Sequence, residues 1–300
     1  MAEIADPITD PFALLSERTA ALIESAAQSV VAVAGGRRST SGIHWRAGVI
    51  VTAEEALERD DDIAVSLPDG RQVPATLAGR DPTTDVAVLR FQPDGLPVAA
   101  LGDAAPLRPG HWVIAVGRHR AGTIASQGIV GVAGPAWQSQ QGGTIDRMIR
   151  LDLSLSLGGE GGAVVDTAGR VLGMSVLGPR RRVLAIPTST IERAVDRLLA
   201  KGHVARAYLG ASLEAVRLVA TQSDKRGVLI VGIDPEGPAA RAGLLVGDII
   251  SQWNGATVSR VRDIWRALGA DSVGTNVALA LLRGGKPETA TVTLGERPIS

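Results

Sequence analysis

The sequence predicts a mostly β protein built of two small six-stranded barrels followed by an α+β module. Glycine is frequent, with 36 residues, while aromatic residues are only 3% of the chain, a composition typical of short strands joined by tight turns. Short runs rich in Val and Ile fall into two successive sets. At 300 residues and 45% hydrophobic content, the chain is long enough to form more than one buried core.

A helix is expected at the N-terminus. Asp10 has the side chain of an N-cap, and Pro11 follows at the first helical position, where its missing N–H costs nothing. Phe12, Leu15 and Leu22 then recur on one helical face. We therefore expect residues 1–28 to form an N-terminal segment with one short amphipathic helix.

The two sets of β runs are expected between residues 29 and 203. Each run is short, is enriched in β-branched residues and is bounded by turn residues. The runs are 30–33, 48–51, 63–67, 73–77 and 86–91 in the first set, and 112–116, 123–132, 148–153, 163–165, 171–176 and 183–186 in the second. A capping box of Ser189 and Glu192 then predicts a closing helix that ends at Gly202.

The third module is expected over residues 207–297, after a short linker. Pro238 and Gly243 bracket one short helical segment. Val261 and Trp265 lie on one face of another. Asn254 and Gly255 between them are typical of a hairpin turn, so the module mixes strands and helices.

Composition excludes several classes of function. Lys plus Arg and Asp plus Glu both number 31, so no net field attracts nucleic acid or anionic lipid. The absence of Cys removes disulfides, thiolate catalysis and Cys-ligated zinc. No transmembrane span is expected, and no signal peptide is recognisable at Met1. The chain as translated is therefore expected to be cytoplasmic, or periplasmic if the true start lies upstream.

Several segments, taken in order, resemble the HtrA (DegP/DegS-like) family of bacterial protein quality control. Residues 79–89 read Gly-Arg-Asp-Pro-Thr-Thr-Asp-Val-Ala-Val-Leu, like the strand that carries the catalytic Asp of that family. Residues 101–103, 107–117 and 185–187 resemble the start and the end of its second barrel, and 237–248 resemble its PDZ signature. The resemblance implies a trypsin-like double β-barrel followed by a PDZ domain. It also implies a homotrimer assembled through the N-terminal part of the protease domain.

The same resemblance places glutamate at two positions of the catalytic triad. Residues 158–162 read Gly-Gly-Glu-Gly-Gly where the family has Gly-Asn-Ser-Gly-Gly, which puts Glu160 at the nucleophile and leaves Gly158, Gly159 and Gly161 as the remnant of the oxyanion loop. Glu55 stands at the position of the histidine, and only Asp85 is retained. Acyl transfer by such a triad requires a hydroxyl and an imidazole, so we expect no serine endopeptidase activity.

Three carboxylates brought together need neutralisation. The arginines at 180–182 are one candidate, although a solvated hairpin tip is the commoner role of such a run. Shared protons are a second candidate, and a hard cation held by oxygen ligands is a third, which we rank last. We expect no cofactor and no resident metal.

The PDZ-like module is expected to bind the C-termini of peptides or proteins. By resemblance, Tyr208, Leu209, Gly210 and Ala211 form the carboxylate-binding loop, and the receiving strand continues through Ser212 and Leu213. Val261 and Trp265 are candidate walls of the groove, with core packing as the alternative for at least one of them.

The favoured hypothesis is an HtrA-like pseudoprotease that acts as a peptide-binding scaffold. The alternative is an active endopeptidase with an unrecognised catalytic arrangement. The chain has four histidines, His44, His111, His119 and His203, and their sequence neighbours indicate ordinary surface positions. A carboxylate hydrolase of another kind, such as a glycosidase, is a weaker third possibility.

Overall fold

A computed structural model describes residues 10–36, 39–93, 95–139, 141–202, 207–217, 226–269 and 272–296. The chain divides into two compact units: Met1–Trp137 with Thr144–Val204, called the barrel unit below, and Gln138–Gly143 with Ala205–Ser300, called the C-terminal unit. Among the residues described, no helix is long and apolar enough to cross a membrane.

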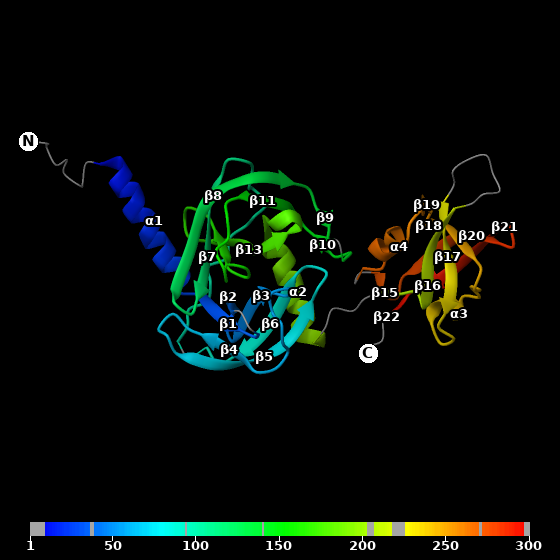
Figure 1. Cartoon of the computed structure of the whole chain (residues 1–300), viewed down its shortest axis with the longest axis horizontal. Helices are drawn as coiled ribbons and strands as arrows, with labels where there is room; N and C mark the ends of the chain where they lie inside the picture. Colours follow the sequence, from blue (N-terminus) through cyan, green and yellow to red (C-terminus); the bar gives the residue numbers. More distant parts are fainter. Residues whose placement is uncertain are drawn as a thin grey trace, which may run out of the picture. The chain divides into compact units, whose positions relative to one another are not determined.

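Helix α1 (Pro11–Ala27) opens the described chain with the predicted N-cap, in which the Asp10 carboxylate accepts a hydrogen bond from the Phe12 N–H at 2.9 Å. Its C-terminal end is packed, since Ala26 and Ala27 are buried, whereas Phe12 at the other end is 81% exposed. Figure 1 shows this helix extending away from the barrels. Burial therefore begins only in the last turns of α1.

The first barrel is closed by six antiparallel strands in the order β1-β2-β3-β6-β5-β4. Its elements are β1 (Val30–Ala34), β2 (Ser39–Arg46), β3 (Val49–Ala53), β4 (Ile63–Ser66), β5 (Gln72–Asp81) and β6 (Val86–Phe91). Five of them lie on predicted runs. The sequence of β2 contains small and polar residues without hydrophobic alternation, and no run was predicted there although most of the strand is buried.

The second barrel closes in the order β11-β14-β13-β12-β7-β8. Its strands are β7 (Trp112–His119), β8 (Gly122–Gly134), β11 (Met148–Asp152), β12 (Ala163–Val165), β13 (Val171–Gly178) and β14 (Arg182–Pro187). The 3-10 turn η1 (Pro179–Arg181) lies between β13 and β14, and β9 (Trp137–Gln138) and β10 (Thr144–Ile145) form a separate two-stranded sheet. All six predicted runs of the second set are strands of this barrel.

Helix α2 (Thr188–Lys201) follows the second barrel and ends as predicted at Gly202, which adopts a left-handed conformation. The predicted capping box is wrong, because the N-cap position is Pro187 and makes no side-chain hydrogen bond. Glu192 instead accepts a hydrogen bond from the Trp45 indole N–H at 2.6 Å and pairs with Arg46. This glutamate thus joins α2 to the first barrel.

The C-terminal unit contains an antiparallel sheet in the order β16-β17-β18-β20-β21 and a separate pair of β15 with β22. The elements are β15 (Ala207–Tyr208), β16 (Ala211–Arg217), β17 (Arg226–Ile233), α3 (Pro238–Arg241), β18 (Ile249–Trp253), β19 (Ala256–Thr257), α4 (Val261–Ala267), β20 (Asn276–Arg283), β21 (Lys286–Thr293) and β22 (Gly295–Glu296). The predicted hairpin turn lies between β18 and β19, with positive φ at both Asn254 and Gly255. The predicted fold class is confirmed.

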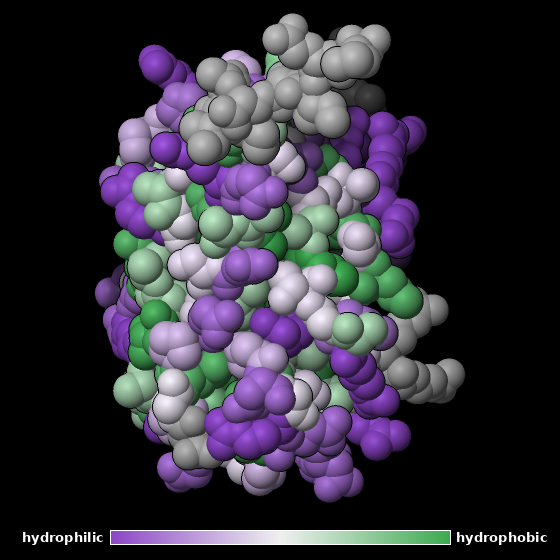
Figure 2. Space-filling model, turned by 90° about the vertical axis from the view of Figure 1, so that its left-hand side faces the viewer, coloured by the Kyte–Doolittle hydropathy of each residue, from purple (hydrophilic) through white to green (hydrophobic). Residues whose placement is uncertain are grey.

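Hydrophobic and hydrophilic side chains are interspersed on the face of the molecule drawn in Figure 2. The apolar side chains of the barrel unit instead gather inside its two barrels and under α2, where Ile43, Trp45 and Ile191 are fully buried. The core is thus built from the strand faces that the hydrophobic runs predict.

Candidate functional site

Asp85 follows a tight turn at the end of β5 that the buried side chain of Asp81 stabilises. The Asp81 carboxylate accepts hydrogen bonds from the Thr83 N–H at 2.9 Å, the Thr83 hydroxyl at 2.5 Å and the Thr84 hydroxyl at 2.6 Å. Asp85 itself has a φ of 57°, a left-handed conformation that a non-glycine residue adopts only when its surroundings enforce it. The turn therefore fixes where the Asp85 carboxylate points.

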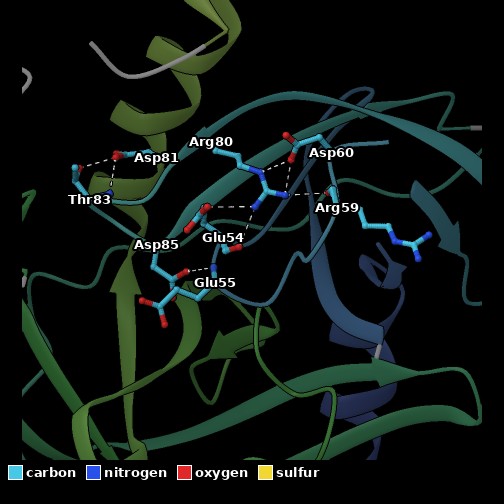
Figure 3. Close-up of polar contacts among 8 residues, drawn as sticks. All are labelled: Glu54, Glu55, Arg59, Asp60, Arg80, Asp81, Thr83 and Asp85. Carbon is cyan, nitrogen blue, oxygen red and sulfur yellow. Dashed lines mark hydrogen bonds and ion pairs between the residues drawn. The ribbon is translucent and has the colours of Figure 1, made fainter. Parts of the chain in front are cut away.

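The Asp85 carboxylate lies beside the segment that follows β3. Its Oδ1 accepts a hydrogen bond from the backbone N–H of Glu55 at 2.8 Å, while its own carbonyl accepts one from the Glu54 N–H at 3.3 Å (Figure 3). The Glu55 side chain is exposed. Asp85 thus touches the backbone of the residue at the predicted base position, but no imidazole is present there.

Arg80 holds the same segment from β5, as Figure 3 shows. Its guanidinium contacts the Glu54 carboxylate and carbonyl, each at 3.2 Å, and the Arg59 carbonyl at 2.9 Å. It also bonds the Asp60 carboxylate at 2.8 Å. Arg80 thus pairs its single positive charge with two carboxylates, those of Glu54 and Asp60, and its guanidinium bonds are made to the loop that follows β3.

The glycine-rich loop carries Glu160 and is bonded to β2 of the first barrel. The Glu160 carbonyl accepts hydrogen bonds from the Ser41 N–H at 2.8 Å and from the Thr40 hydroxyl at 2.5 Å. The Ser41 hydroxyl donates to the Gly158 carbonyl at 2.6 Å. Only glycine fits at position 161 of the loop, because Gly161 has a φ of 79° and a Cβ there would collide with the Ser41 carbonyl.

Electrostatics place Asp85, Glu55 and Glu160 in one neighbourhood. Burial raises the pKa of Asp85 to about 7, the hydrogen bond from Glu55 opposes this, and the charges of Glu55, Glu54 and Glu160 raise it further. Burial also raises the pKa of Glu160, while the charge of Arg181 and a hydrogen bond from the Leu177 backbone act in the opposite direction. The charges of Glu55 and Glu160 therefore influence Asp85, and the charge of Arg181, from the predicted arginine run, acts on Glu160.

The described histidines make no contact that would form another triad. His44 Nδ1 bonds the Pro97 carbonyl at 2.9 Å, His111 Nε2 accepts from Arg108 at 3.1 Å, and His119 Nδ1 accepts from the Ala121 N–H at 3.4 Å. Over the part of the chain that is described, none is hydrogen-bonded to a Ser or Thr hydroxyl; His203 lies outside it. The surface position expected for His44 is wrong, because its ring is 1% exposed in the barrel interior, where burial lowers its pKa.

The acidic side chains near Asp85 belong to no larger cluster of metal-ligating groups among the described residues. Within the described ranges, no group of three or more His, Asp or Glu residues is placed to hold a metal ion. The Asp85 carboxylate instead accepts a hydrogen bond from the Glu55 backbone N–H, and the Glu160 carboxylate interacts with the charge of Arg181.

The loop from Tyr208 to Ala211 is folded against the start of α3. The Leu209 carbonyl accepts a hydrogen bond from the Ala239 backbone N–H at 2.8 Å, and the Gly210 carbonyl accepts one from the Asp234 backbone N–H at 3.0 Å. Gly210 has a φ of 75°, and a Cβ there would meet the Cα of Gly237 at 2.9 Å. The loop is therefore defined by its backbone and by a close approach that only glycine permits.

Strand β16, with Ala211, Ser212 and Leu213, forms one end of the sheet. In the described residues it pairs with β17 on one side only, which leaves its other edge open to a further strand. Helix α4 packs next to β16. Val261 is packed against the hydrophobic core of the unit, whereas Trp265 is 64% exposed.

Sequence reasoning missed the residues that hold the site in place. Ser41 and Arg80 carry no motif of their own, and their roles depend on partners 119 and 26 residues away, counted to Glu160 and Glu54. The only available signal was the position of Arg80 inside the stretch that carries Asp85.

Two family models match the chain, one for each part of the predicted architecture. Residues 40–174 match the trypsin-like peptidase domain, and residues 207–294 match the PDZ domain. The curated relatives include probable periplasmic serine endoproteases, described as DegP-like, from Halomonas elongata and Brucella suis. They are 35% and 33% identical over 269 and 265 residues, which is 84% of this chain in both cases, but 55% and 51% of the relatives. The chain thus spans about half the length of the curated relatives it matches.

Solved structures agree with the sequence relatives. The HtrA-type protease AlgW, solved with a decapeptide, is 26% identical and superposes with a TM-score of 0.72 over 94% of this chain and 99% of its own. A serine endoprotease from Yersinia pestis is 29% identical, with a TM-score of 0.70 over 92% of this chain and 97% of its own.

The relatives' names correct the predicted location. They are described as periplasmic, which contradicts the expectation of a cytoplasmic protein. That expectation rested on the composition of the residues after Met1 alone. With a trypsin-like peptidase domain, a PDZ domain, DegP-like relatives and HtrA structural neighbours, the chain belongs to the HtrA family.

Proposed function

We propose that this HtrA protein is inactive as a serine endopeptidase and acts as a scaffold that binds peptide segments through its PDZ domain. The observation that carries the proposal is the sequence itself, which has Glu160 and Glu55 where the family motif has a serine and a histidine. The effect of both charges on Asp85 supports this alignment. The surrounding backbone is well formed, so the loss concerns the reacting side chains rather than the fold.

The chemistry of these carboxylates opposes proteolysis. A carboxylate at position 160 offers no hydroxyl proton to a base, and its negative charge would lie close to the position where a tetrahedral oxyanion develops. Glu55 could accept a proton, but Glu160 provides no hydroxyl for it to activate. Losing the nucleophile and the base of such a triad costs about 10⁶-fold in turnover.

Cleavage of β-casein by the purified protein tests this proposal, with Glu160→Ala as the matched variant. We expect neither protein to release fragments above the level of a buffer control. Cleavage abolished by Glu160→Ala would refute the proposal and assign Glu160 to an active enzyme. Equal cleavage by both proteins would instead favour a catalytic arrangement elsewhere in the chain.

Peptide binding is supported by the geometry of the C-terminal unit. The open edge of β16 can receive an extended peptide by backbone pairing, and the Gly210 loop stands at the start of that strand. AlgW has been solved with a decapeptide and with a tripeptide, and it is similar to this chain over both domains. Trp265 and Val261 on α4 are proposed to flank the bound peptide.

Fluorescence titration with a peptide that ends in an apolar residue tests the binding site. We expect a dissociation constant in the micromolar range, as for other small strand-addition interfaces. The same peptide with an amidated C-terminus should bind more weakly, because the loop would lose its carboxylate partner. Equal affinity of the two peptides would contradict the assignment of the Gly210 loop.

We also propose a homotrimer that assembles through the N-terminal segment, as the resemblance implies. The exposed apolar side chains of Phe12, Leu14 and Leu15 on α1 are consistent with an interface there. Light scattering should give three times the chain mass for the wild-type protein, and a lower mass for Phe12→Ser/Leu15→Ser. A monomeric wild-type protein would contradict this assembly.

A further inference from the structure

We infer that an arginine-lined pocket in the second barrel binds a small, multiply charged anion that carries phosphate or carboxylate groups. The pocket has a volume of about 510 Å³ and lies between β8, β11 and the loop that enters β14. Arg150, Arg181 and Arg182 line it, together with one acid, Asp152. Its volume lies within the range of pockets that hold small ligands.

The three guanidinium groups make no direct polar bond in the described part of the protein, although the charge of Glu160 acts on Arg181. Across the described ranges of the chain, Arg150, Arg181 and Arg182 form no side-chain hydrogen bond or ion pair with a protein group. Asp152 is exposed and forms no ion pair with the arginines described here. Three arginines and one aspartate therefore give the lining a net charge of plus two. Glu160, which is not part of the lining, opposes one of these positive charges through Arg181.

Other arginines of the barrel unit are used differently. Arg80 bonds Glu54 and Asp60, and Arg193 bonds both carboxylate oxygens of Asp146, at 2.8 and 3.0 Å. These two arginines of the barrel unit are thus paired with carboxylates. Arg150, Arg181 and Arg182 line one pocket without an ion pair, so an anion that enters it would be attracted by three positive charges, which solvent screens only in part.

The shape and chemistry of the lining limit the ligand. A guanidinium recognises carboxylate and phosphate oxygens through two parallel hydrogen bonds, so Arg side chains favour these anions over halides. Ile129, Leu151 and Val183 add apolar surface to the same pocket. The expected ligand therefore has at least two negative charges and a compact body.

The loop holds its arginines in a defined conformation. Arg180 and Arg181 have φ values of 58° and 56°, in the left-handed region that non-glycine residues seldom adopt. Arg181 also acts electrostatically on Glu160, which links the pocket to the degenerate triad. An anion in the pocket would compete with Glu160 for Arg181.

Isothermal titration of the full chain with inorganic pyrophosphate and, separately, with citrate tests this inference. The test variant is Arg181→Gln/Arg182→Gln, and Arg150→Gln repeats the test from β11. The control, Arg90→Gln/Arg120→Gln, removes the same charge from two exposed arginines that do not line the pocket. Each variant is first checked to have the wild-type unfolding midpoint without anion.

We expect the wild-type protein to bind at least one of the two anions, and the loop variant to lose about tenfold in affinity while the control changes less than about twofold. Binding of pyrophosphate alone identifies a phosphate ligand, and binding of citrate alone identifies a carboxylate ligand. No binding of either anion would overturn the inference. Equal losses in the test and control variants would also overturn it, because they would reflect net charge rather than a site.

Discussion

The loop around Glu160 and the loop around Gly210 are built in similar ways but depend on their side chains to different degrees. Both contain a glycine with positive φ that approaches another backbone too closely for a Cβ, and both are fixed by hydrogen bonds to backbone carbonyls. Around Glu160 the chemistry of the family would come from side chains. Around Gly210, peptide recognition would come from backbone groups.

This difference explains how one activity can be lost while another is kept. Replacing the side chain at position 160 removes the attacking group and leaves the backbone scaffold in place. Recognition by strand addition requires only an open edge and a shaped loop, which tolerate changes of side chains. The following predictions test whether the two loops are separable in this way.

Restoring the triad should have the largest effect. The double variant Glu55→His/Glu160→Ser should cleave casein several orders of magnitude faster than the wild-type protein, because Asp85 is already bonded to the backbone of residue 55. A complete catalytic triad contributes roughly 10⁶-fold to turnover. Each single variant should remain inactive, because neither supplies both groups, and adding Asp85→Asn should remove most of the gain. An inactive double variant with an intact fold would show that the scaffold has also diverged.

The pH dependence of stability should report the buried acid. Because the folded pKa of Asp85 is raised to about 7 from 3.8, the folded state holds its proton more tightly than the unfolded state. Stability is therefore lost as the pH rises from about 4 to about 7, by up to about 4 kcal/mol. Asp85→Asn should remove this loss in urea titrations at a series of pH values.

His44 provides the reason for comparing variants rather than reading the wild-type curve alone. Its pKa is lowered by burial, so protonation destabilises the fold as the pH falls through and below the ordinary histidine value. The two residues thus act in opposite directions. The Asp85→Asn difference isolates the carboxyl, and an unchanged pH profile in that variant would contradict its raised pKa.

Glycine-to-alanine changes should separate the two loops. Gly161→Ala should lower the free energy of unfolding of the barrel unit by about 3 kcal/mol, from the left-handed conformation and from the collision with the Ser41 carbonyl. Gly210→Ala should instead reduce peptide affinity and leave the melting of the barrel unit unchanged. Calorimetry and peptide titration on both variants check this, and a loss of peptide binding in Gly161→Ala would show that the loops are coupled.

The smallest expected effect concerns Arg181. Replacing Glu160 with Gln removes the charge that attracts this arginine, so pyrophosphate affinity should rise about two- to threefold. Glu214→Gln, an exposed acid of the C-terminal unit, is the matched control and should leave the affinity unchanged. Equal increases in both variants would indicate a general charge effect.

Most of the strands could be predicted because their hydrophobic runs coincide with their buried faces, as in β1 and β6. β2 could not, since its Ser, Thr and Gly residues are buried by hydrogen bonds and close packing rather than by apolar area. The capping box at Ser189 failed for a similar reason, because Glu192 is used by Trp45 and Arg46 in another part of the chain.

The residues around the degenerate triad were predictable only through motifs. The stretch that carries Asp85 and the glycines around Glu160 made these positions recognisable, but periodicity and composition alone would have indicated ordinary turns. Nothing local predicts that Arg181 rather than Arg180 acts on Glu160, because this depends on how the loop folds back onto the barrel.

The bonds that Ser41 makes have a mechanical consequence. Its hydroxyl also accepts a hydrogen bond from the Arg118 N–H at 2.9 Å, so one small side chain of β2 joins two segments of the second barrel. The position of residue 160 thus depends on β2, a strand of the first barrel. A substitution that loosened β2 would shift whatever chemistry is placed at residue 160, which makes Ser41 the first position to keep constant when new activities are built into this scaffold.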